Sequence, residues 1–230
     1  MLAGFRSKAT NYLPHIKLPV PYRLAPHRRL NVYIDCELGH PLNFREPSVQ
    51  KFLYKNIANY NMFYDVGAHI GTHTVLSSHQ GENIDIHSFE PHPENADRLR
   101  ENIDLNGISD YTSVAEKAVS DVDGSVKLNV GSSEAHSVTD IYENTEQLPV
   151  SSTTLNNYAS SHNTPGLIKV DVEGAGGVLL KGATSLLNSQ TDWIVETHNQ
   201  SERDAFHTIF ESEGYLLHRL NHNHFFATIE

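Results

Sequence analysis

A turn with two glycines, in the stretch DVGAHIG at residues 65–71, is the first feature of the chain that predicts ligand binding. Gly67 and Gly71 let the backbone turn sharply and approach a ligand closely. Glu90 stands at the end of the next apolar segment, where an acid often accepts hydrogen bonds from ribose hydroxyls. The spacing alone therefore indicates an adenosine-like ligand, with a purely structural turn as the alternative.

The charges around this turn narrow the choice of ligand. The turn lacks one glycine of the pattern G-x-G-x-x-G, whose bare backbone amides hold the pyrophosphate of a dinucleotide. Asp65 and Glu90 would repel a pyrophosphate by about 1–4 kcal/mol for each close pair of charges. S-adenosylmethionine suits them better, because it has a sulfonium, an amino group and a ribose but no phosphate. We predict these cofactor-binding residues: Asp65, Gly67, His69, Gly71, Glu90 and Ala118.

Strand and helix patterns alternate from about residue 46 onward and would bring these residues to one edge of a sheet. The last two predicted strands are joined by only Asn221-His222-Asn223, so they must form an antiparallel hairpin. In a mostly parallel sheet of this kind, ligands bind beyond the carboxyl ends of the strands, near the point where strand order reverses. The strands that we predict here are residues 61–66, 84–90, 111–120, 166–171, 193–196, 215–220 and 224–230, with an extra strand that follows a turn at Asp123-Gly124.

Other local patterns are less regular. Residues 131–152 are rich in Ser, Thr and Glu, and we expect a loop excursion over one edge of the sheet. Ser201, with Asp204 three residues later, predicts a capping-box-like helix start. The remaining histidines are expected to be exposed: His73, His79, His87, His92, His218, His222 and His224. Only the last three have a spacing that would gather a transition metal.

Size and composition predict one α/β domain with a short extension. The chain has 230 residues, of which 38% are hydrophobic, enough for a packed core. The single cysteine, Cys36, excludes a disulfide framework within the chain and favours a reducing compartment. Because no apolar stretch approaches about 20 residues and no signal-like core is present, we expect a cytoplasmic protein without a transmembrane segment.

The charge is unevenly distributed along the chain. The net charge is −11, yet residues 1–34 contain six Lys or Arg residues and no acid. The acidic remainder argues against nucleic acid as a partner, because phosphate contacts need a basic groove. The basic arm is expected to lie along the acidic body, with weak contact to an anionic surface as the alternative.

The chain resembles the FkbM-like family of class I methyltransferases in six segments: FYDVGAHIGTHT, FEPHPENADRLRENIDLNG, AVSDVDGSVKL, TTLNNY, IKVDVEGAGGVLLKGA and IVETHN. The resemblance covers roughly residues 45–220, and its most selective part is K-x-DVEG before an LKGA helix. It implies a doubly wound, Rossmann-like methyltransferase sheet that is mostly parallel with a C-terminal antiparallel hairpin. It also implies S-adenosylmethionine as cofactor, usually for O-methylation of a sugar, glycan or natural-product hydroxyl. We divide the chain into a basic arm and cap, residues 1–45, and a methyltransferase domain, residues 46–230.

Two departures from the family pattern concern the predicted site. His69 replaces the usual Asn, and Gly176 replaces the usual acid and is followed by Gly177. Two helical glycines cost about 1 kcal/mol each relative to Ala, so close packing or local flexibility is expected there.

Four side chains at the ends of two adjacent predicted strands form the predicted catalytic group: Asp171, Glu173, Glu196 and His198. By the resemblance they face the methyl group. In one role His198 or Glu173 is the base, while Asp171 and Glu196 orient it or the substrate. In a second, weaker alternative Asp171, Glu196 and His198 hold a divalent cation, which is possible but not expected. In a third, Asp171 and Glu173 cap the following helix.

Two other functions stay open beside methyl transfer. The missing G-x-G-x-x-G disfavours a nicotinamide-dependent oxidoreductase on a similar sheet. The joint presence of so many site acids disfavours a non-catalytic cofactor-binding or scaffold domain. The acceptor is expected to be a small molecule or glycan, and its identity and the oligomeric state are left open by the sequence.

Overall fold

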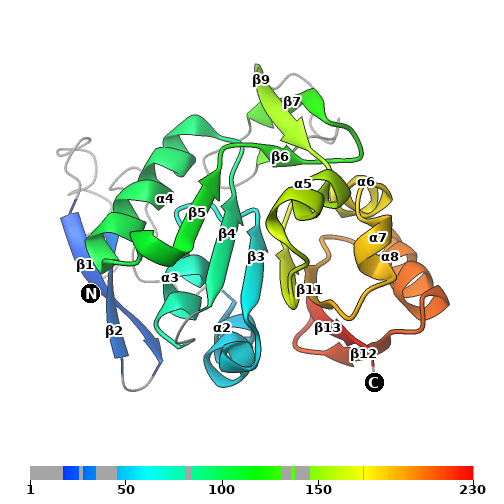
Figure 1. Ribbon diagram of the computed structural model, residues 1–230, viewed down its shortest axis with the longest axis horizontal. Helices are drawn as coiled ribbons and strands as arrows, with labels where there is room; N and C mark the ends of the chain where they lie inside the picture. Colours follow the sequence, from blue (N-terminus) through cyan, green and yellow to red (C-terminus); the bar gives the residue numbers. More distant parts are fainter. Residues whose placement is uncertain are drawn as a thin grey trace, which may run out of the picture.

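The computed structural model describes residues 18–25, 28–34, 46–80, 84–130, 136–137, 146–172 and 174–229. Its centre is a seven-stranded sheet in the order β12-β13-β11-β10-β3-β4-β5 (Figure 1). The strands are β3 (Met62–Val66), β4 (Asp85–Phe89), β5 (Thr112–Ala115), β10 (Leu167–Val170), β11 (Asp192–Glu196), β12 (Leu216–Arg219) and β13 (His224–Thr228). β13 is antiparallel to both of its neighbours, whereas the other pairs are parallel. The predicted mostly parallel sheet with a C-terminal hairpin is confirmed.

Helices cover both faces of this sheet, which makes the fold doubly wound. Phe63 of β3 packs on one face with residues of the first three helices, and Tyr64 packs on the other with residues of the last four. Successive strand residues point to opposite faces, so a strand buried on both sides is mostly apolar, and Asp65 in β3 and Lys169 in β10 are exceptions. The helices are α2 (Pro47–Asn56), α3 (Thr72–Ser78), α4 (Pro93–Asn106), α5 (Leu155–His162), α6 (Gly176–Lys181), α7 (Thr184–Leu187) and α8 (Gln200–Ser212), with short 3-10 turns η1 (Ile57–Asn59) and η2 (Ser109–Tyr111).

The strand order reverses between β3 and β10. From β3 the chain builds outward through β4 to β5, whereas β10 and β11 are added on the opposite side. Val66 and Val170, the last residues of β3 and β10, are register partners, so the two carboxyl ends lie side by side. Ligands of doubly wound sheets bind at such a switch point.

A second sheet has the order β6-β9-β7-β8 and was not predicted as a sheet, although the extra strand expected after Asp123-Gly124 is its strand β7 (Figure 1). Its strands are β6 (Ala118–Val119), β7 (Gly124–Val130), β8 (His136–Ser137) and β9 (Glu146–Thr153). The expectation of a loop throughout 131–152 is therefore wrong from residue 146 onward, where β9 pairs antiparallel with β7. Val150 and Ser152 are buried and the intervening Ser151 is exposed. This alternation is that of a strand, hidden by a Ser- and Thr-rich composition.

The start of α8 also differs from the prediction. The helix begins at Gln200, and the side chain of Asn199 caps it by accepting a hydrogen bond from the Glu202 backbone N–H at 2.8 Å. Glu202 in turn accepts from the backbone N–H of His198 at 2.8 Å. The capping pattern thus begins two residues before the expected Ser201, which lies inside the helix.

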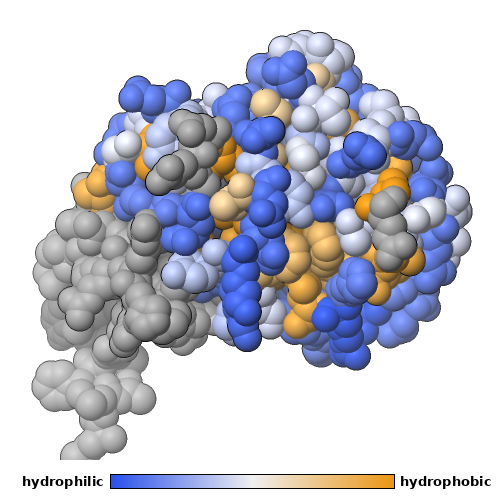
Figure 2. Space-filling view, turned by 60° about the horizontal axis from the view of Figure 1, so that its bottom comes forward, coloured by the Kyte–Doolittle hydropathy of each residue, from blue (hydrophilic) through white to orange (hydrophobic). Residues whose placement is uncertain are grey.

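The N-terminal part that is described forms a hairpin of β1 (Leu18–Ala25) and β2 (Arg28–Ile34), with β2 next to α4 (Figure 1). Figure 2 shows a face on which hydrophilic residues predominate, with hydrophobic ones between them. Over the described part of the chain, no helix combines the length and apolar character that crossing a bilayer requires.

Candidate functional site

The turn after β3 has the backbone conformation that its glycines predict. Gly67, His69 and Gly71 have positive φ angles of 79°, 52° and 88°. A Cβ atom at Gly67 would overlap the backbone carbonyl oxygen of Asp171, so the turn packs directly against the end of β10. The backbone N–H groups of Gly67 and Ala68 both donate to the Phe89 carbonyl at 3.0 Å. These contacts tie the turn to the ends of both neighbouring strands.

Glu90 is buried beside this turn and is held by backbone amides. One carboxylate oxygen accepts from the His69 N–H at 2.9 Å, and the other accepts from the His92 N–H at 2.9 Å. Burial raises the pKa of Glu90 to about 7, although these hydrogen bonds oppose the shift. The loops on either side therefore fix the orientation of this carboxylate.

Asp65 lies behind the turn and is fully buried. Its Oδ2 accepts a hydrogen bond from the Thr74 hydroxyl at 2.7 Å, and that hydroxyl is 2.8 Å from the Ser88 hydroxyl. Asp65 thus links β3, α3 and β4 rather than facing solvent.

The second half of the site surrounds a buried lysine. Lys169 is only 1% exposed, and its ammonium lies 3.1 Å from Asp171 and 3.9 Å from Glu46. Burial would lower the pKa of Lys169, but the surrounding carboxylates, led by Asp171, raise it above its ordinary value. Burial would likewise raise the pKa of Asp171, but the charge of Lys169 lowers it.

Glu196 is the last residue of β11, next to the end of β10, and it forms a pair with Asp171. Burial and the negative charge of Asp171, to which Glu196 is hydrogen-bonded, raise the pKa of Glu196 to about 10. At neutral pH the pair therefore holds one proton and one negative charge, because two adjacent carboxylates cannot both ionise cheaply.

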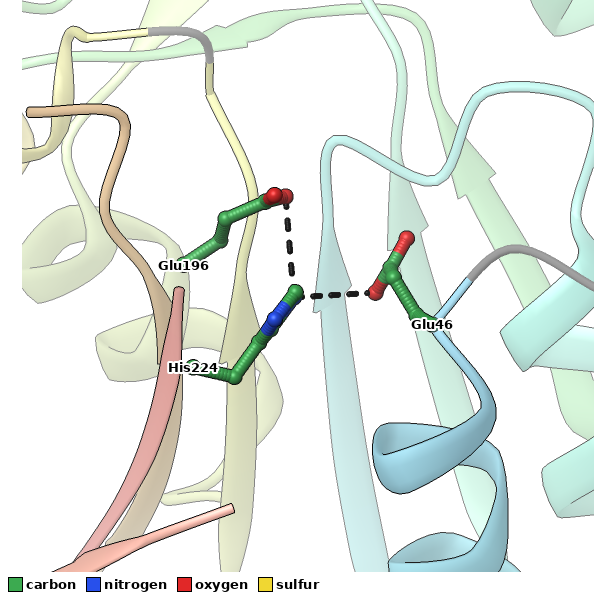
Figure 3. Close-up of side chains that lie close together, drawn as sticks. All are labelled: Glu46, Glu196 and His224. Atoms are coloured by element: carbon green, nitrogen blue, oxygen red, sulfur yellow. Dashed lines mark ion pairs between the residues drawn. The ribbon is translucent and has the colours of Figure 1, made fainter. Parts of the chain in front are cut away.

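His224 and Glu46 complete the cluster from outside the predicted set (Figure 3). The Nε2 atom of His224 lies 3.2 Å from Glu46 Oε2 and 3.6 Å from Glu196 Oε2. His224 is the register partner of Glu196 in the β11–β13 pair, so the sheet itself places them together. The expectation that His224 is exposed is wrong, since the residue is 4% exposed.

His198 sits at the more open side of the cluster. Its side chain is 26% exposed, and its Nδ1 lies 3.6 Å from Glu202 Oε2. Burial would raise the pKa of Glu202, but hydrogen bonds from His198 lower it. Ligand atoms of Asp171, Glu196 and His198 lie within 4.8 Å of one another, so the structure brings this predicted trio together.

Other predicted residues are placed as follows. Gly71 is the N-cap of α3, and a Cβ there would collide with Leu99. Ala118 is buried in β6 against Leu128 and Val150. Glu173 lies outside the described residues. Two of the remaining histidines, His73 and His87, are buried, so the expectation that they face solvent is wrong.

Three residues of the site were missed by the sequence reasoning, namely Glu46, Lys169 and Glu202, and His224 was considered only as an exposed residue or as a metal ligand together with His218 and His222. A lysine inside the apolar strand IKV was a usable signal, because a fully buried lysine requires partner charges. Glu202 stands three residues after the N-cap Asn199, in the spacing of a capping box. Glu46 and His224 come from opposite ends of the domain, and no local spacing connects them.

The comparisons with known proteins agree with this architecture. The family profile described as Methyltransferase FkbM domain matches residues 65–221. The curated protein "Hexuronic acid methyltransferase AglP" of Haloferax volcanii is 29% identical over 160 residues, which cover 66% of this chain and 62% of that protein. The chain therefore spans less than two thirds of the length of this relative.

Solved structures share the fold at low sequence identity. A methyltransferase FkbM from Methylobacillus flagellatus KT has a TM-score of 0.54 and 14% identity, over 73% of this chain and 43% of that chain. An O-methyltransferase from Bacillus cereus, solved in complex with SAH, has a TM-score of 0.51 and 14% identity, over 83% and 84% of the two chains. These likenesses establish a methyltransferase-type Rossmann-like fold.

Proposed function

Because the chain belongs to the FkbM methyltransferase family, we propose that it transfers a methyl group from S-adenosylmethionine to a hydroxyl of a sugar, glycan or related small molecule. The observation that carries the proposal is the pairing of a glycine turn at the switch point with the oriented Glu90 carboxylate and, across from it, the Asp171–Glu196–His198 group. The archaeal relative, whose name states that it methylates hexuronic acid, supports a sugar acceptor.

The residues around the turn fit the proposed cofactor. Glu90 has both oxygens oriented by backbone amides and keeps further lone pairs, which suit two neighbouring ribose hydroxyls. The buried acids beside the turn suit a cationic ligand without phosphates. When bound, S-adenosylmethionine supplies an electrophilic methyl group on its sulfonium. Asp65 acts from behind the turn by holding Thr74 and thereby the start of α3.

The acceptor hydroxyl needs to lose a proton, and we propose that His198 takes it. Its side chain is partly exposed, and the Glu202 carboxylate beside Nδ1 would stabilise the imidazolium that results. This arrangement of a histidine backed by a carboxylate is the common form of a general base. Asp171, fixed by Lys169, and Glu196 hold the acceptor through its other hydroxyls.

The nicotinamide alternative is not favoured, because the turn lacks the second early glycine of G-x-G-x-x-G and the acids beside it would repel a pyrophosphate. Calorimetry separates the two. Wild-type protein is expected to bind S-adenosylhomocysteine and not NAD, and Glu90→Ala to weaken that binding strongly. Normal binding by Glu90→Ala, or binding of NAD alone, would contradict the cofactor assignment.

Methyl transfer is tested with labelled S-adenosylmethionine against a panel of uronic acids, neutral sugars and other hydroxyl compounds. On an accepted substrate, we expect His198→Gln to lower kcat by roughly 10²–10⁴-fold while leaving S-adenosylhomocysteine affinity unchanged. Asp171→Asn should also spare cofactor binding and depress turnover. Full turnover by His198→Gln would remove this residue as the base, and its exposed neighbour His222 provides the matched control.

A further inference from the structure

A histidine and two glutamates from three separate segments meet next to the proposed methyl-transfer centre. Glu46 precedes α2, Glu196 ends β11 and His224 begins β13 (Figure 3). One ligand atom from each of the three lies within 4.8 Å of the other two. Glu46 and His224 lie outside the stretch that matches the family profile, so nothing in the proposed function assigns them a role.

The orientation of His224 is fixed by Asn221. The Asn221 Oδ1 atom accepts from the backbone N–H groups of Asn223 and His224 at 2.8 and 2.9 Å, which identifies it as the amide oxygen. The His224 Nδ1 atom lies 3.2 Å from this oxygen and must therefore carry the proton that it donates. In the neutral ring, the lone pair is then on Nε2, which points between the two glutamates. Metal-binding histidines are commonly oriented by such a second hydrogen bond.

The atoms that meet at this point are buried and incompletely satisfied. His224 has only 4% of its surface exposed to solvent. Both His224 Nε2 and Glu46 Oε2 are inaccessible and have no hydrogen-bond partner among the described residues, apart from the ion-pair contacts given above and a contact of Glu46 Oε2 with His73 Nε2 at 3.7 Å. Glu46 also has a left-handed backbone, with φ of 53°, which is uncommon for a residue with a side chain. A buried polar atom without a hydrogen bond costs about 1–3 kcal/mol.

The charges favour a cation at this position. Four carboxyl groups act on Lys169, namely those of Glu46, Asp65, Asp171 and Glu196, and even with one proton on the Asp171–Glu196 pair their negative charge exceeds the single positive charge of this lysine. Its ammonium lies nearer to Asp171, at 3.1 Å, than to Glu46 Oε2, at 3.9 Å. Glu46 Oε2, the atom that faces His224, is therefore too far from the Lys169 ammonium for a hydrogen bond, and its other neighbour is His73 Nε2 at 3.7 Å.

We propose that Glu46, Glu196 and His224 form a binding site for one divalent first-row transition-metal ion. Two carboxylates and one imidazole suit Mn²⁺, Fe²⁺ or Zn²⁺, whereas a site for Mg²⁺ or Ca²⁺ is made of oxygen ligands. Three protein ligands leave coordination positions for water or for hydroxyls of the acceptor. The other trio, Asp171, Glu196 and His198, is less suitable because Asp171 is already bound to Lys169 and His198 lies next to Glu202.

Metal binding is measured on the full chain after chelator treatment, by titration calorimetry with Mn²⁺ and with Zn²⁺, and by the Mn²⁺ EPR signal. We expect one ion per chain, with affinity lowered at least about 10-fold in Glu46→Gln and in His224→Gln. His222→Gln, an exposed histidine on the same hairpin, should bind as the wild type does. Circular dichroism checks that each variant is folded. If His224→Gln does not fold, retention of the nitrogen coupling to Mn²⁺ in His198→Gln provides the independent test.

The outcomes separate the possibilities. Absence of saturable binding to the wild type would overturn the proposal, and the carboxylates would then be balanced by protons and Lys169 alone. Loss of binding in His198→Gln but not in His224→Gln would also overturn it, by assigning the ion to the other trio. Because S-adenosylhomocysteine binding is measured separately and without added metal, failure of this site leaves the proposed methyl transfer untouched.

Discussion

At the scale of single residues, Glu90 shows how burial and local hydrogen bonds set the properties of a ligand group. Its carboxylate can be buried because it accepts hydrogen bonds from two backbone amides and from the Asn95 side chain. The pKa nevertheless rises, since the loss of hydration outweighs these hydrogen bonds. The group that we propose as a ribose ligand is therefore also a group whose charge changes near neutral pH.

This shift has a measurable consequence for stability. The pKa of Glu90 is about 7 in the folded chain against its ordinary value of 4.5, so the folded state holds the proton up to a higher pH than the unfolded state does. Stability from this group is thus present at low pH and lost as pH rises from 4.5 to 7, by roughly 3 kcal/mol in all. In urea denaturation, the stability of Glu90→Gln relative to the wild type should increase from pH 5 to pH 8. A difference that does not vary with pH would contradict the assignment.

Residue chemistry was predictable where it is local in sequence. The glycines at 67 and 71 and the acid at 90 follow apolar strands directly, and their spacing was enough to predict a nucleoside site. Glu46 and His224 were not predictable in the same way. They meet only because α2 starts beside the sheet edge and because β13 pairs in register with β11.

At the scale of secondary structure, α6 explains the two adjacent glycines that depart from the family pattern. A Cβ on Gly176 would collide with the Phe206 ring and would lie 3.3 Å from a Glu202 oxygen, whereas a Cβ on Gly177 would meet nothing within 4 Å. Close packing between α6 and α8 thus accounts for the first glycine. It also puts Glu202 where a side chain at 176 would point.

The two glycines are therefore expected to respond in opposite directions to alanine. Gly176→Ala must displace the buried Phe206 and should destabilise the chain by about 1–3 kcal/mol. Gly177 lies in the same turn of the helix, but a Cβ there would point into open space. Gly177→Ala should therefore stabilise the chain by about 0.5–1 kcal/mol. Chemical denaturation of both variants measures this. Equal effects would show that the α6–α8 contact is not as described.

The prediction of secondary structure failed at β9, where a polar composition hides the alternation of buried and exposed residues that is typical of a strand. The segment before β9 is rich in Ser and Thr, and it separates β9 from its partner β7 in the sequence. No local sequence pattern therefore indicates that these two strands pair. The main sheet was predictable because its strands are buried on both faces and alternate regularly with helices. The helix start at Asn199 was missed because Ser201 offered a similar capping spacing two residues later.

At the scale of the whole molecule, the net charge of −11 restricts the acceptor. Binding to nucleic acid depends on many Lys or Arg contacts to phosphates, and the acidic residues of this chain oppose them. We expect no shift of duplex or single-stranded RNA in a gel at about 50 mM salt, where such contacts are strongest. Saturable RNA binding under these conditions would contradict a small-molecule or glycan acceptor.

The arrangement of the whole sheet leads to the central claim, that the switch point between β3 and β10 binds S-adenosylmethionine. The most direct measurement is a crystal structure of the chain with S-adenosylhomocysteine. We predict density over the turn at Gly67–Gly71, with the ribose hydroxyls within hydrogen-bonding distance of Glu90 and the sulfur facing Asp171 and His198. Density at another place on the sheet, or no bound nucleoside at saturating concentration, would contradict the account.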